Sequence, residues 1–553
     1  MTSLLNIGTS SLAAAQGQLT TISHNIANAN TVGYSRQEAQ QATAGGLMTG
    51  AGFFGRGVDM ATVQRRYDQF AAASVLASTS QAAADASRSE ALSQLDALFA
   101  NGDLGVGASI DQLFAATGDL ANRPGDTATR QAFLARAADL AQRATSLGTQ
   151  LQDLATQADA QLAQTATQVN DRLAEIQRLN ERIASLAAGG QPPNDLLDQR
   201  EQAIAQLGGL MAVRTVTGAD GSINLFTPGG SPLIVGTQRS VLVAAPDPSS
   251  PGTTGLRLDI GTGTSQWLEG PDLGGGSLAG LMQFRDQDLQ AARTRLGSLV
   301  QGLADAFNAQ HQLGTDANGA PGQPLFAVAL ATDGVANGLK ALALSAAQVA
   351  TGQASMVEAG AANTGGARVA AFSVTRTTPD SALAVSITFN NPPTTFNITG
   401  LAGGNLSNVP YTPGQAIPPA PADYNGWRLT LEGAPAAGDS FGLQATAYPR
   451  SDNRNALALG QLARLAGANG TFNEAYAGLL ADVGNRVQGA REMANVSAAM
   501  KDEALARQAS AAGVNLDEEA ANLLRFQQAY QASAKIIQAS QLLFDTLLSA
   551  TRG

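Results

Sequence analysis

The chain has 553 residues and a mass of 56.2 kDa, enough for several domains at about 100–200 residues each. Lys and Arg number 33 and Asp and Glu 44, so the net charge is −11 and the isoelectric point is about 4.8. Such an acidic chain repels phosphates, and it carries no basic patch, which excludes general binding to nucleic acid or anionic membranes. Charged residues make up only 14% of it, and its many Ala residues favour closely packed helices.

The sequence contains no Cys, which excludes disulfides, thiolate metal sites and Cys nucleophiles. This is compatible with the cytoplasm and equally with export of an unfolded chain. No apolar run reaches the ~18–20 residues needed to span a bilayer. The first basic residue is Arg36, so the opening residues lack the basic region of a secretory signal peptide. If the protein leaves the cell, we expect a route without a cleaved leader.

The first 30 residues show a heptad pattern. A helix is predicted from about Ser3 to Ala29, and an Asn-rich stretch that ends at Gly33 stops it. Apolar or small residues recur at alternating spacings of three and four, which is typical of a coiled-coil seam. This N-terminal seam consists of Leu5, Gly8, Leu12, Ala15, Leu19, Ile22 and Ile26.

The middle of the chain alternates between helical and β segments. Residues 41–59 are Gly-rich and predict a loop or short extended pieces. The longest helix is predicted over 128–187, which contains no Pro and only one Gly, Gly148. Further helices are predicted over 63–99, 108–121, 194–207 and 277–312. β structure is predicted over 211–268, with a hairpin at Asp220-Gly221, and over most of 325–450.

The last segment has the strongest pattern. Asn515 is placed to cap a helix, with Glu518 completing a capping box, and three acidic residues face the positive end of the helix dipole. A ten-position seam then runs at alternating spacings of four and three. This C-terminal seam consists of Leu516, Ala520, Leu523, Gln527, Tyr530, Ala534, Ile537, Gln541, Phe544 and Leu548.

Two interpretations of these heptad ends stay open. One is an ordinary amphipathic helix on a globular core. The other, which we favour because both ends show seams, is that the ends pair with each other and with neighbouring copies, and are loose in the monomer. Gln527 and Gln541 would weaken an isolated coil but can fix its register.

Candidate catalytic groups are few. His24 lies beside the N-terminal seam, and His311 ends the 277–312 helix, where its side chain can meet the negative end of the dipole. Ser277 sits in a Gly-Gly-Ser-Leu-Ala sequence whose last residue is Ala279 where a nucleophile elbow has Gly. We therefore predict that Ser277 caps a helix.

Metal and cofactor motifs are equally weak. The stretch around Asp316 contains D-x-N-G, a fragment of a calcium loop without its remaining ligands. A carboxylate pair such as Glu269 with Asp272 leaves glycosidase chemistry open, although the aromatic content of 5% argues against a sugar-stacking cleft. We predict no catalytic, metal or cofactor site, no cofactor and no enzyme.

These elements predict an elongated α+β multidomain protein, in which a helical coiled-coil or bundle framework from both chain ends carries inserted β domains. Residues 1–40 and 511–553 form paired terminal heptad helices. Residues 41–207, 277–312 and 451–510 form a helical bundle domain. Residues 208–276 form a β-rich domain, and 325–450 form an inserted outer β domain.

Both ends of the chain also resemble a known family. The N-terminal stretch ISHNIANANTVGYSRQ (22–37) and the C-terminal stretch 513–548 are similar to the terminal signatures of bacterial flagellar rod, hook and hook-associated proteins. GRGVDMATVQRRYDQF (55–70), NDLLDQREQAIAQL (194–207) and GGSLAGLMQFRDQ (275–287) resemble the members at the hook–filament junction. The N-terminal signature residues are Asn25, Asn28, Thr31, Gly33, Tyr34 and Arg36.

The resemblance implies a structural, non-enzymatic protein that joins hook to filament. It implies export by the flagellar type III apparatus without signal cleavage, and a chaperone that binds the C-terminal helical region. It implies homo-oligomeric assembly into an extracellular tube whose inner wall is the terminal helices, with the hook protein and a second junction protein as partners. In such a junction we also expect Gln527 and Gln541 to allow small register shifts at a modest cost. Membrane insertion and nucleic-acid binding are not implied. The alternatives are another flagellar axial protein or, less favoured, a secreted adhesin or enzyme.

Tyr34 and Arg36 follow the first helix within the signature. We weigh two interpretations equally: they fix the bend after that helix, or they are ordinary packing and a solvated charge.

Overall fold

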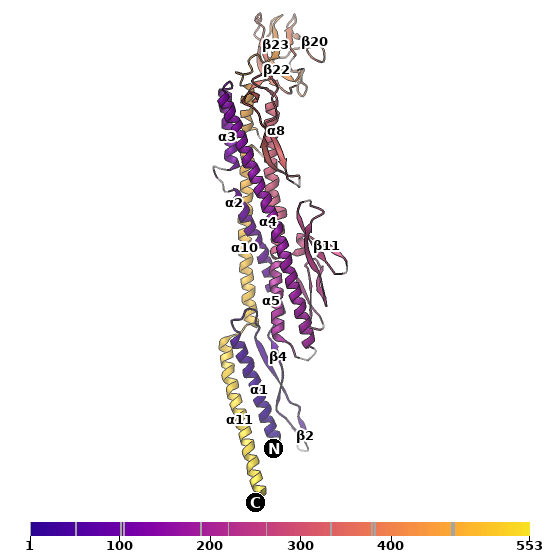
Figure 1. Cartoon of the computed structure of the whole chain (residues 1–553), viewed down its shortest axis with the longest axis vertical. Helices are drawn as coiled ribbons and strands as arrows, with labels where there is room; N and C mark the ends of the chain where they lie inside the picture. The colour runs from indigo at the N-terminus through magenta and orange to yellow at the C-terminus, as the bar shows by residue number, and fades with distance from the viewer. Residues whose placement is uncertain are drawn as a thin grey trace. The chain divides into compact units, whose positions relative to one another are not determined.

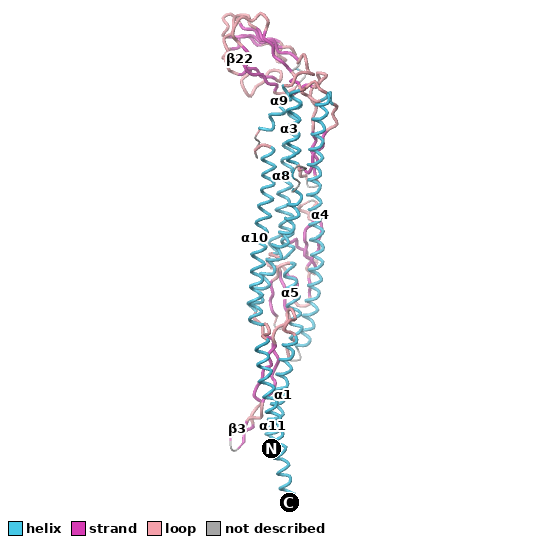
Figure 2. Tube along the Cα trace, turned by 90° about the vertical axis from the view of Figure 1, so that its left-hand side faces the viewer, coloured by secondary structure: helices cyan, strands magenta, loops and turns pink. Residues whose placement is uncertain are grey.

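The structure is a computed structural model that describes residues 2–49, 52–99, 102, 105–187, 191–218, 220–250, 252–261, 263–331, 334–377, 380, 383–465 and 470–552. Two compact units emerge from its internal contacts. The first contains Met1–Ser93, Thr156–Gln287 and Arg486–Gly553, and the second contains Gln94–Ala155 and Asp288–Asn485. Long helices at both ends with strands between them confirm the α+β class (Figure 2). The four-part domain division stays a prediction.

The two terminal helices belong to the first unit and lie side by side (Figure 1). Helix α1 spans Thr2–Ala27 and helix α11 spans Leu516–Arg552. After α1 the chain forms the antiparallel strands β1 (Gln37–Thr43) and β4 (Val58–Arg65), which we call the ribbon. Between them lie the short strands β2 (Leu47–Thr49) and β3 (Gly52–Phe54), which pair with each other.

The predicted start of the second helix at residue 63 is wrong. Residues up to Arg65 continue β4, where Arg65 pairs with Gln37 across the ribbon. Helix α2 (Gln69–Phe99) begins after Asp68, whose carboxylate accepts hydrogen bonds from the backbone N–H groups of Phe70 and Ala71. A side-chain cap at Asp68 therefore sets the boundary.

The remainder of the first unit packs two small sheets and short helices around a shared apolar core that includes Leu173, Leu207, Leu225 and Leu256. Its helices are α5 (Asn194–Leu210), α6 (Gly270–Leu273) and α7 (Gly276–Gln283), followed by a π-helical stretch (Phe284–Leu289). The sheets have the orders β5-β6-β7-β8 and β11-β10-β9. The strands are β5 (Arg214–Thr217), β6 (Ile223–Phe226), β7 (Pro232–Val235), β8 (Gln238–Arg239), β9 (Val241–Pro246), β10 (Thr254–Asp259) and β11 (Ser265–Leu268).

Two local predictions in this region have different outcomes. The hairpin at Asp220-Gly221 is confirmed, because β5 pairs with β6 and Gly221 has a φ of +78°. Ser277 is not a helix cap: the residue before α7 is Gly275, and no side chain caps this helix. A Cβ on Gly276 would lie 2.3 Å from the backbone nitrogen of Met211, so Gly276 allows the close approach of two backbone segments there.

The second unit contains helices α3 (Val106–Asn122), α8 (Gln290–Gln312) and α9 (Arg454–Gln461). Helices α4 (Thr127–Ala187) and α10 (Phe472–Ala512) contribute residues to both units, as does α2. The strands of the second unit are β12 (Gly314–Thr315), β13 (Phe326–Leu330), β14 (Ala336–Ala341), β15 (Gly352–Gln353), β16 (Ser355–Ala359), β17 (Arg368–Val374), β18 (Val385–Phe389), β19 (Thr395–Thr399), β20 (Leu406–Pro410), β21 (Ala416–Ile417), β22 (Trp427–Glu432) and β23 (Ser440–Ala445).

The inserted β region of this unit has its own core. The five-stranded sheet β16-β23-β18-β19-β20 and the three-stranded sheet β17-β22-β21 share a cluster of buried residues that includes Phe396, Trp427 and Phe441. The predicted β content of 325–450 is therefore confirmed.

The single Gly of α4 allows a strand to contact the helix backbone. The Thr145 hydroxyl donates a hydrogen bond to the carbonyl of Leu339 on β14 at 2.8 Å. The same hydroxyl accepts one from the Leu339 N–H at 3.0 Å. A Cβ on Gly148 would lie 1.5 Å from the carbonyl oxygen of Asn337 on the same strand. This helix position is therefore restricted to Gly by packing.

We predict that Gly148→Ala destabilises the protein by about 1–3 kcal/mol, because the added methyl forces the strand away. The matched control is Gly118→Ala in α3, where no atom lies within 4 Å of the new Cβ. That change should stabilise by about 0.5–1 kcal/mol through helix propensity. Thermal unfolding midpoints measure both, and a stabilising Gly148→Ala would contradict the packing.

Candidate assembly interface

Helices α1 and α11 approach closely because small residues face the contact. A Cβ on Gly8 would lie 2.9 Å from the side chain of Ile537 on α11. On α1, Ala15 and Ile22 are each 4% exposed, and on α11 Ser533 is 6% exposed. Gly8 therefore allows the two helices to approach closely at this point.

The N-terminal seam largely follows this contact. Gly8, Ala15 and Ile22 are buried, and Leu12 and Leu19 are half-buried. The outermost members, Leu5 and Ile26, are exposed.

The C-terminal seam is only partly covered within the chain. Leu523, Ala534, Ile537 and Leu548 are half-buried, whereas Leu516, Ala520, Gln527, Tyr530, Gln541 and Phe544 are exposed. The line of α11 that is buried or half-buried runs through Glu519, Asn522, Phe526, Ala529, Ser533, Ile537 and Ser540. From Glu519 to Ser533 this covered line lies one residue before the predicted seam. It begins at a polar residue, Glu519, which an apolar seam does not include.

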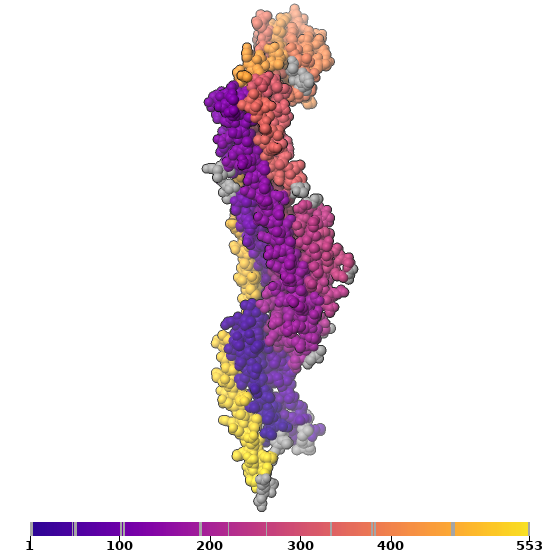
Figure 3. All heavy atoms as spheres, in the orientation of Figure 1, coloured from indigo at the N-terminus to yellow at the C-terminus, as the bar shows by residue number. Residues whose placement is uncertain are grey.

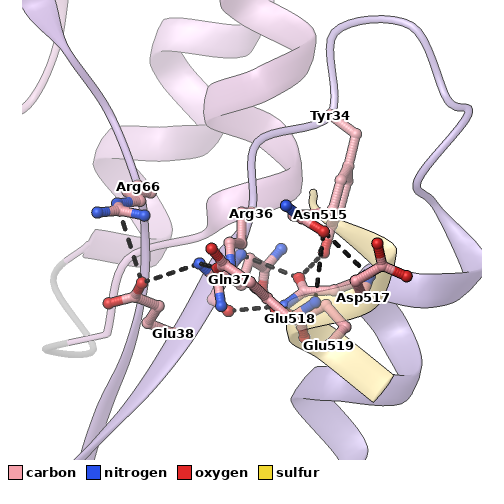
Figure 4. Close-up of polar contacts among 10 residues, drawn as sticks. Tyr34, Arg36, Gln37, Glu38, Arg66, Asn515, Asp517, Glu518 and Glu519 are labelled. Atoms are coloured by element: carbon pink, nitrogen blue, oxygen red, sulfur yellow. Dashed lines mark hydrogen bonds and ion pairs between the residues drawn. The ribbon is translucent and has the colours of Figure 1, made fainter. Parts of the chain in front are cut away.

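A buried polar cluster joins the end of α1 to the start of α11 (Figure 4). Asn25 is 1% exposed, and its amide nitrogen donates to the Gln37 carbonyl at 2.9 Å and to the Glu519 carboxylate at 3.1 Å. Its amide oxygen accepts from the Tyr34 hydroxyl at 2.7 Å and from the Gln37 backbone N–H at 3.0 Å. All four hydrogen-bonding positions of the amide are therefore occupied.

Arg36 provides the charged part of the cluster. Its Nε donates to Glu519 at 2.7 Å and its terminal nitrogen to Glu518 at 3.0 Å. Its backbone N–H also donates to the carbonyl of Ala512, the last residue of α10. The side chain of Arg36 is 10% exposed and that of Glu519 is 1% exposed, so this ion pair is largely withdrawn from water. We call Asn25, Tyr34, Arg36 and Glu519 the terminal clamp.

The predicted cap of α11 is confirmed in part. The Asn515 side chain accepts hydrogen bonds from the N–H groups of Asp517 and Glu518. The Glu518 carboxylate, which was expected to complete a capping box, contacts Arg36 instead.

Helix α5 contacts the same segment from another side. The Ser35 N–H donates to Asp198 at 3.0 Å, and Arg65 forms ion pairs with Asp198 at 3.0 Å and Glu201 at 2.5 Å. Burial would lower the pKa of Arg65, but its hydrogen bonds to Glu201 and Asp198 raise that pKa. Burial, reinforced by the charges of nearby carboxylates on α5 and α11, raises the pKa of Tyr34 far above its usual value. Tyr34 therefore stays a neutral donor to Asn25.

The other signature residues shape the turn after α1. Asn28 accepts a hydrogen bond from the Thr31 hydroxyl at 3.2 Å, and Gly33 has a φ of +82°. The ring of His24 contacts the Tyr34 ring edge-on at 5.5 Å. Tyr34 and Arg36 are thus part of a buried network, which favours the first interpretation given above, a fixed bend.

The other candidate chemical groups have structural contacts. His311 is fully buried: its Nδ1 donates to the Gln323 carbonyl, and its Nε2 accepts from the Ala350 N–H at 2.8 Å. The sequence predicted that its side chain meets the negative end of the helix dipole, but burial lowers the pKa of His311 to about 4, so the buried ring is neutral. The Asp316 carboxylate accepts from the N–H groups of Asn318 and Ala320, which fixes a turn.

The described residues contain neither a candidate metal site nor a membrane-spanning helix. Within them no group of three or more His, Cys, Asp or Glu side chains is placed to hold a metal ion. No helix in the described part of the chain has the length and apolar character needed to cross a membrane.

The sequence reasoning missed the partners of the signature residues. Glu519, Asp198 and Arg65 hold the segment 34–37 in place, yet none belongs to the predicted sites. A signal was present, because Asp198 lies in the 194–207 motif and Arg65 in the 55–70 motif that carry the resemblance.

Three family models match the chain. "Flagellar hook-associated protein FlgK helical domain" matches residues 92–326, "Flagellar basal body rod FlgEFG protein C-terminal" matches 509–550 and "Flagella basal body rod protein" matches 5–34. Of the terminal clamp, Asn25 and Tyr34 lie within the match over 5–34 and Glu519 lies within the match over 509–550, whereas Arg36 follows the first match.

Full-length relatives decide the family. Flagellar hook-associated protein 1 of Salmonella typhimurium is 32% identical over 99% of this chain and 100% of its own length. That of Escherichia coli is 30% identical over the same shares. The chain belongs to the flagellar hook-associated protein 1 family. The flagellar hook junction protein FlgK from Burkholderia pseudomallei, 24% identical, has the same fold, with a TM-score of 0.70 over 79% of this chain and 99% of that one.

Membership of the hook-associated protein 1 family confirms the resemblance read from the sequence. It also confirms a structural role in the flagellum.

We predict that Glu519→Ala loosens the terminal helices, because it leaves Arg36 buried without its main partner, at a cost of about 3–5 kcal/mol. Amide hydrogen exchange in α1 and α11 should rise at least about 100-fold. The control is Glu518→Ala, which removes a carboxylate whose side chain is 57% exposed and should cost less than about 1 kcal/mol. Equal exchange in wild type and Glu519→Ala would contradict the clamp.

We predict a pH dependence from His311. Its folded-state pKa is about 4 and its ordinary value 6.5, so between these values only the unfolded chain is protonated, and stability falls as the pH falls. From pH 7 to pH 5, wild type should lose about 2 kcal/mol more than His311→Asn. Urea unfolding at the two pH values measures this. The same pH dependence in both proteins would contradict a neutral buried His311.

Proposed function

We propose that this chain joins the hook to the filament by assembling with its own copies through the paired terminal helices. One observation supports this above the others: the last turns of α11 expose large apolar side chains. The exposed fractions are 39% for Ile536, 70% for Leu542, 51% for Leu543, 54% for Phe544 and 47% for Leu547. In the space-filling view the yellow end of α11 lies on the surface beside the indigo α1 (Figure 3).

The position of these residues around the helix matters. Ile536, Leu543 and Leu547 recur at spacings of seven and four and share one face. Leu542 lies on another face, so the end of the helix is apolar on more than one side. Residues 536–544 also contain no charged side chain. A helix with apolar side chains on more than one side normally packs against more than one neighbour, and the covered line of α11 occupies only one side. Neighbouring copies would cover the remainder.

The exposed members of the C-terminal seam fit the same proposal. Leu516, Tyr530 and Phe544 are apolar seam positions left open within the chain. Gln527 and Gln541 are exposed seam positions that would allow small register shifts between copies. Such tolerance would suit a junction between two different lattices.

The proposed partners follow from the family. They are further copies of this chain, the hook protein, a second junction protein and an export chaperone that binds the C-terminal helical region. We propose export without a cleaved leader and an extracellular position at the hook–filament junction. The absence of Cys suits passage as an unfolded chain. We further propose that the chain is not an enzyme.

We predict that Leu543→Asp blocks assembly, because it places a charge in the proposed contact between copies. Electron microscopy of cells carrying this variant should show hooks without filaments, with at least about tenfold more flagellin shed into the medium. The control is Leu330→Asp, which changes a side chain that is 65% exposed in the second unit. Normal filaments with Leu543→Asp would contradict the proposed function, and loss of the hook itself would place the chain earlier in the structure.

A further inference from the structure

The short strands β2 and β3 present apolar side chains that are exposed in the described part of the chain. Met48 on β2 is 87% exposed, and Phe54 on β3 is 57% exposed. No charged residue occurs from Ala39 to Gly55, in a chain that is 14% charged. We call the paired strands β2 and β3 the hairpin tip. An uncharged surface with exposed Met and Phe is typical of a contact made with another molecule.

Within its own chain the hairpin tip is separated from α11 by α1. On one face of α1, Gly8 contacts Ile537 of α11. On another face, a Cβ on Gly57 of the ribbon segment would lie 2.2 Å from the Ser10 hydroxyl, and one on Gly17 would lie 2.2 Å from the side chain of Met60. Figure 1 shows this order, with α11 on one side of α1 and β2 and β4 on the other.

The ribbon is also fixed to α1 by a polar contact. The Gln18 side chain donates to the Ala39 carbonyl on β1 at 2.6 Å. The two uncovered apolar surfaces, the hairpin tip and the end of α11, are therefore held on different sides of one helix. One chain cannot bring them together without losing these contacts.

We propose that the hairpin tip of one copy docks on the exposed end of α11 of a second copy. This inference rests on the proposed function and names the segment that covers α11. Both surfaces are apolar: 39–55 on the hairpin side and 536–544 on α11 contain no Asp, Glu, Lys or Arg, and Lys535 and Asp545 flank the second segment.

The geometry of such a contact has a further consequence. The two surfaces are different parts of the same chain, so the contact is heterologous, and each copy keeps one donor and one acceptor surface free. Repetition of a heterologous contact produces a ring or a helical filament and does not stop at a dimer. This is the property that a tubular junction requires.

Cysteine cross-linking tests the proposal, and the absence of natural Cys makes the background clean. In full-length protein carrying Met48→Cys and Leu543→Cys together, a short bismaleimide should link copies into a ladder beyond the dimer. Either single variant should give no ladder. The matched control combines Met48→Cys with Glu503→Cys on α10, whose side chain is 64% exposed, and should also give no ladder. The reagent is added to hook–filament complexes sheared from cells whose junctions consist of this chain.

The outcomes separate the two proposals. Filaments attached to hooks without a ladder from this pair would overturn the docking of the hairpin tip and leave the proposed function intact. A cross-link to a protein of another mass would overturn it by identifying a different occupant. If the first pair prevents assembly, Phe54→Cys with Leu547→Cys provides a second test. A junction that assembles from this second pair without giving a ladder would also overturn the proposal. Failure of the proposed function itself would instead appear as normal filaments with Leu543→Asp.

Discussion

The buried ion pair between Arg36 and Glu519 is the contact on which the arrangement of the terminal region depends. It links residues 483 positions apart and closes the end of α1 onto the start of α11. The helix interface itself is made largely of small residues such as Gly8 and Ala15, which permit close approach but define register weakly. A buried charged pair with a single satisfactory geometry can provide the missing specificity. Asn25 strengthens that role because its amide is saturated by groups from the segment 34–37 and from α11.

The clamp also explains why apolar surface can stay exposed without misfolding. With α11 fixed at its first turn, the remainder of the helix lies along α1, and its far end needs no further intramolecular contact. The ribbon packs on a separate face of α1, where Gly17 of α1 and Gly57 beside β4 allow close contact. Each copy thus presents two apolar surfaces that its own fold keeps apart.

Sequence pattern predicted the elements that depend on local information. The long helix α4 followed from a stretch without Pro, and the N-terminal seam followed from a pattern of small and apolar residues. The covered line of α11 could not be predicted in this way, because two adjacent lines both satisfy the spacing and the buried one contains Glu519. Choosing between them required knowledge of Arg36, which is remote in sequence.

Other failures share this non-local cause. Residues 63–65, which were predicted to begin a helix, continue strand β4 because β1 pairs with them. His311 ends a helix in the sequence, yet its two hydrogen-bond partners come from later segments that bury it. Ser277 has the right residue type for a cap, but α7 begins one residue earlier, at Gly276, where the backbone of Met211 lies close. In each case a tertiary contact overrode a valid local preference.

The most direct measurement is a double-mutant cycle of Arg36→Met and Glu519→Leu in the full chain, with the free energy of opening of α11 taken from amide hydrogen exchange. If the two side chains stabilise the terminal helices as a pair, the loss of opening free energy in the double variant should be smaller than the sum of the two single losses. The difference should be at least about 2 kcal/mol. A coupling energy near zero would show that the ion pair does not hold the two ends of the chain together, and would contradict the account.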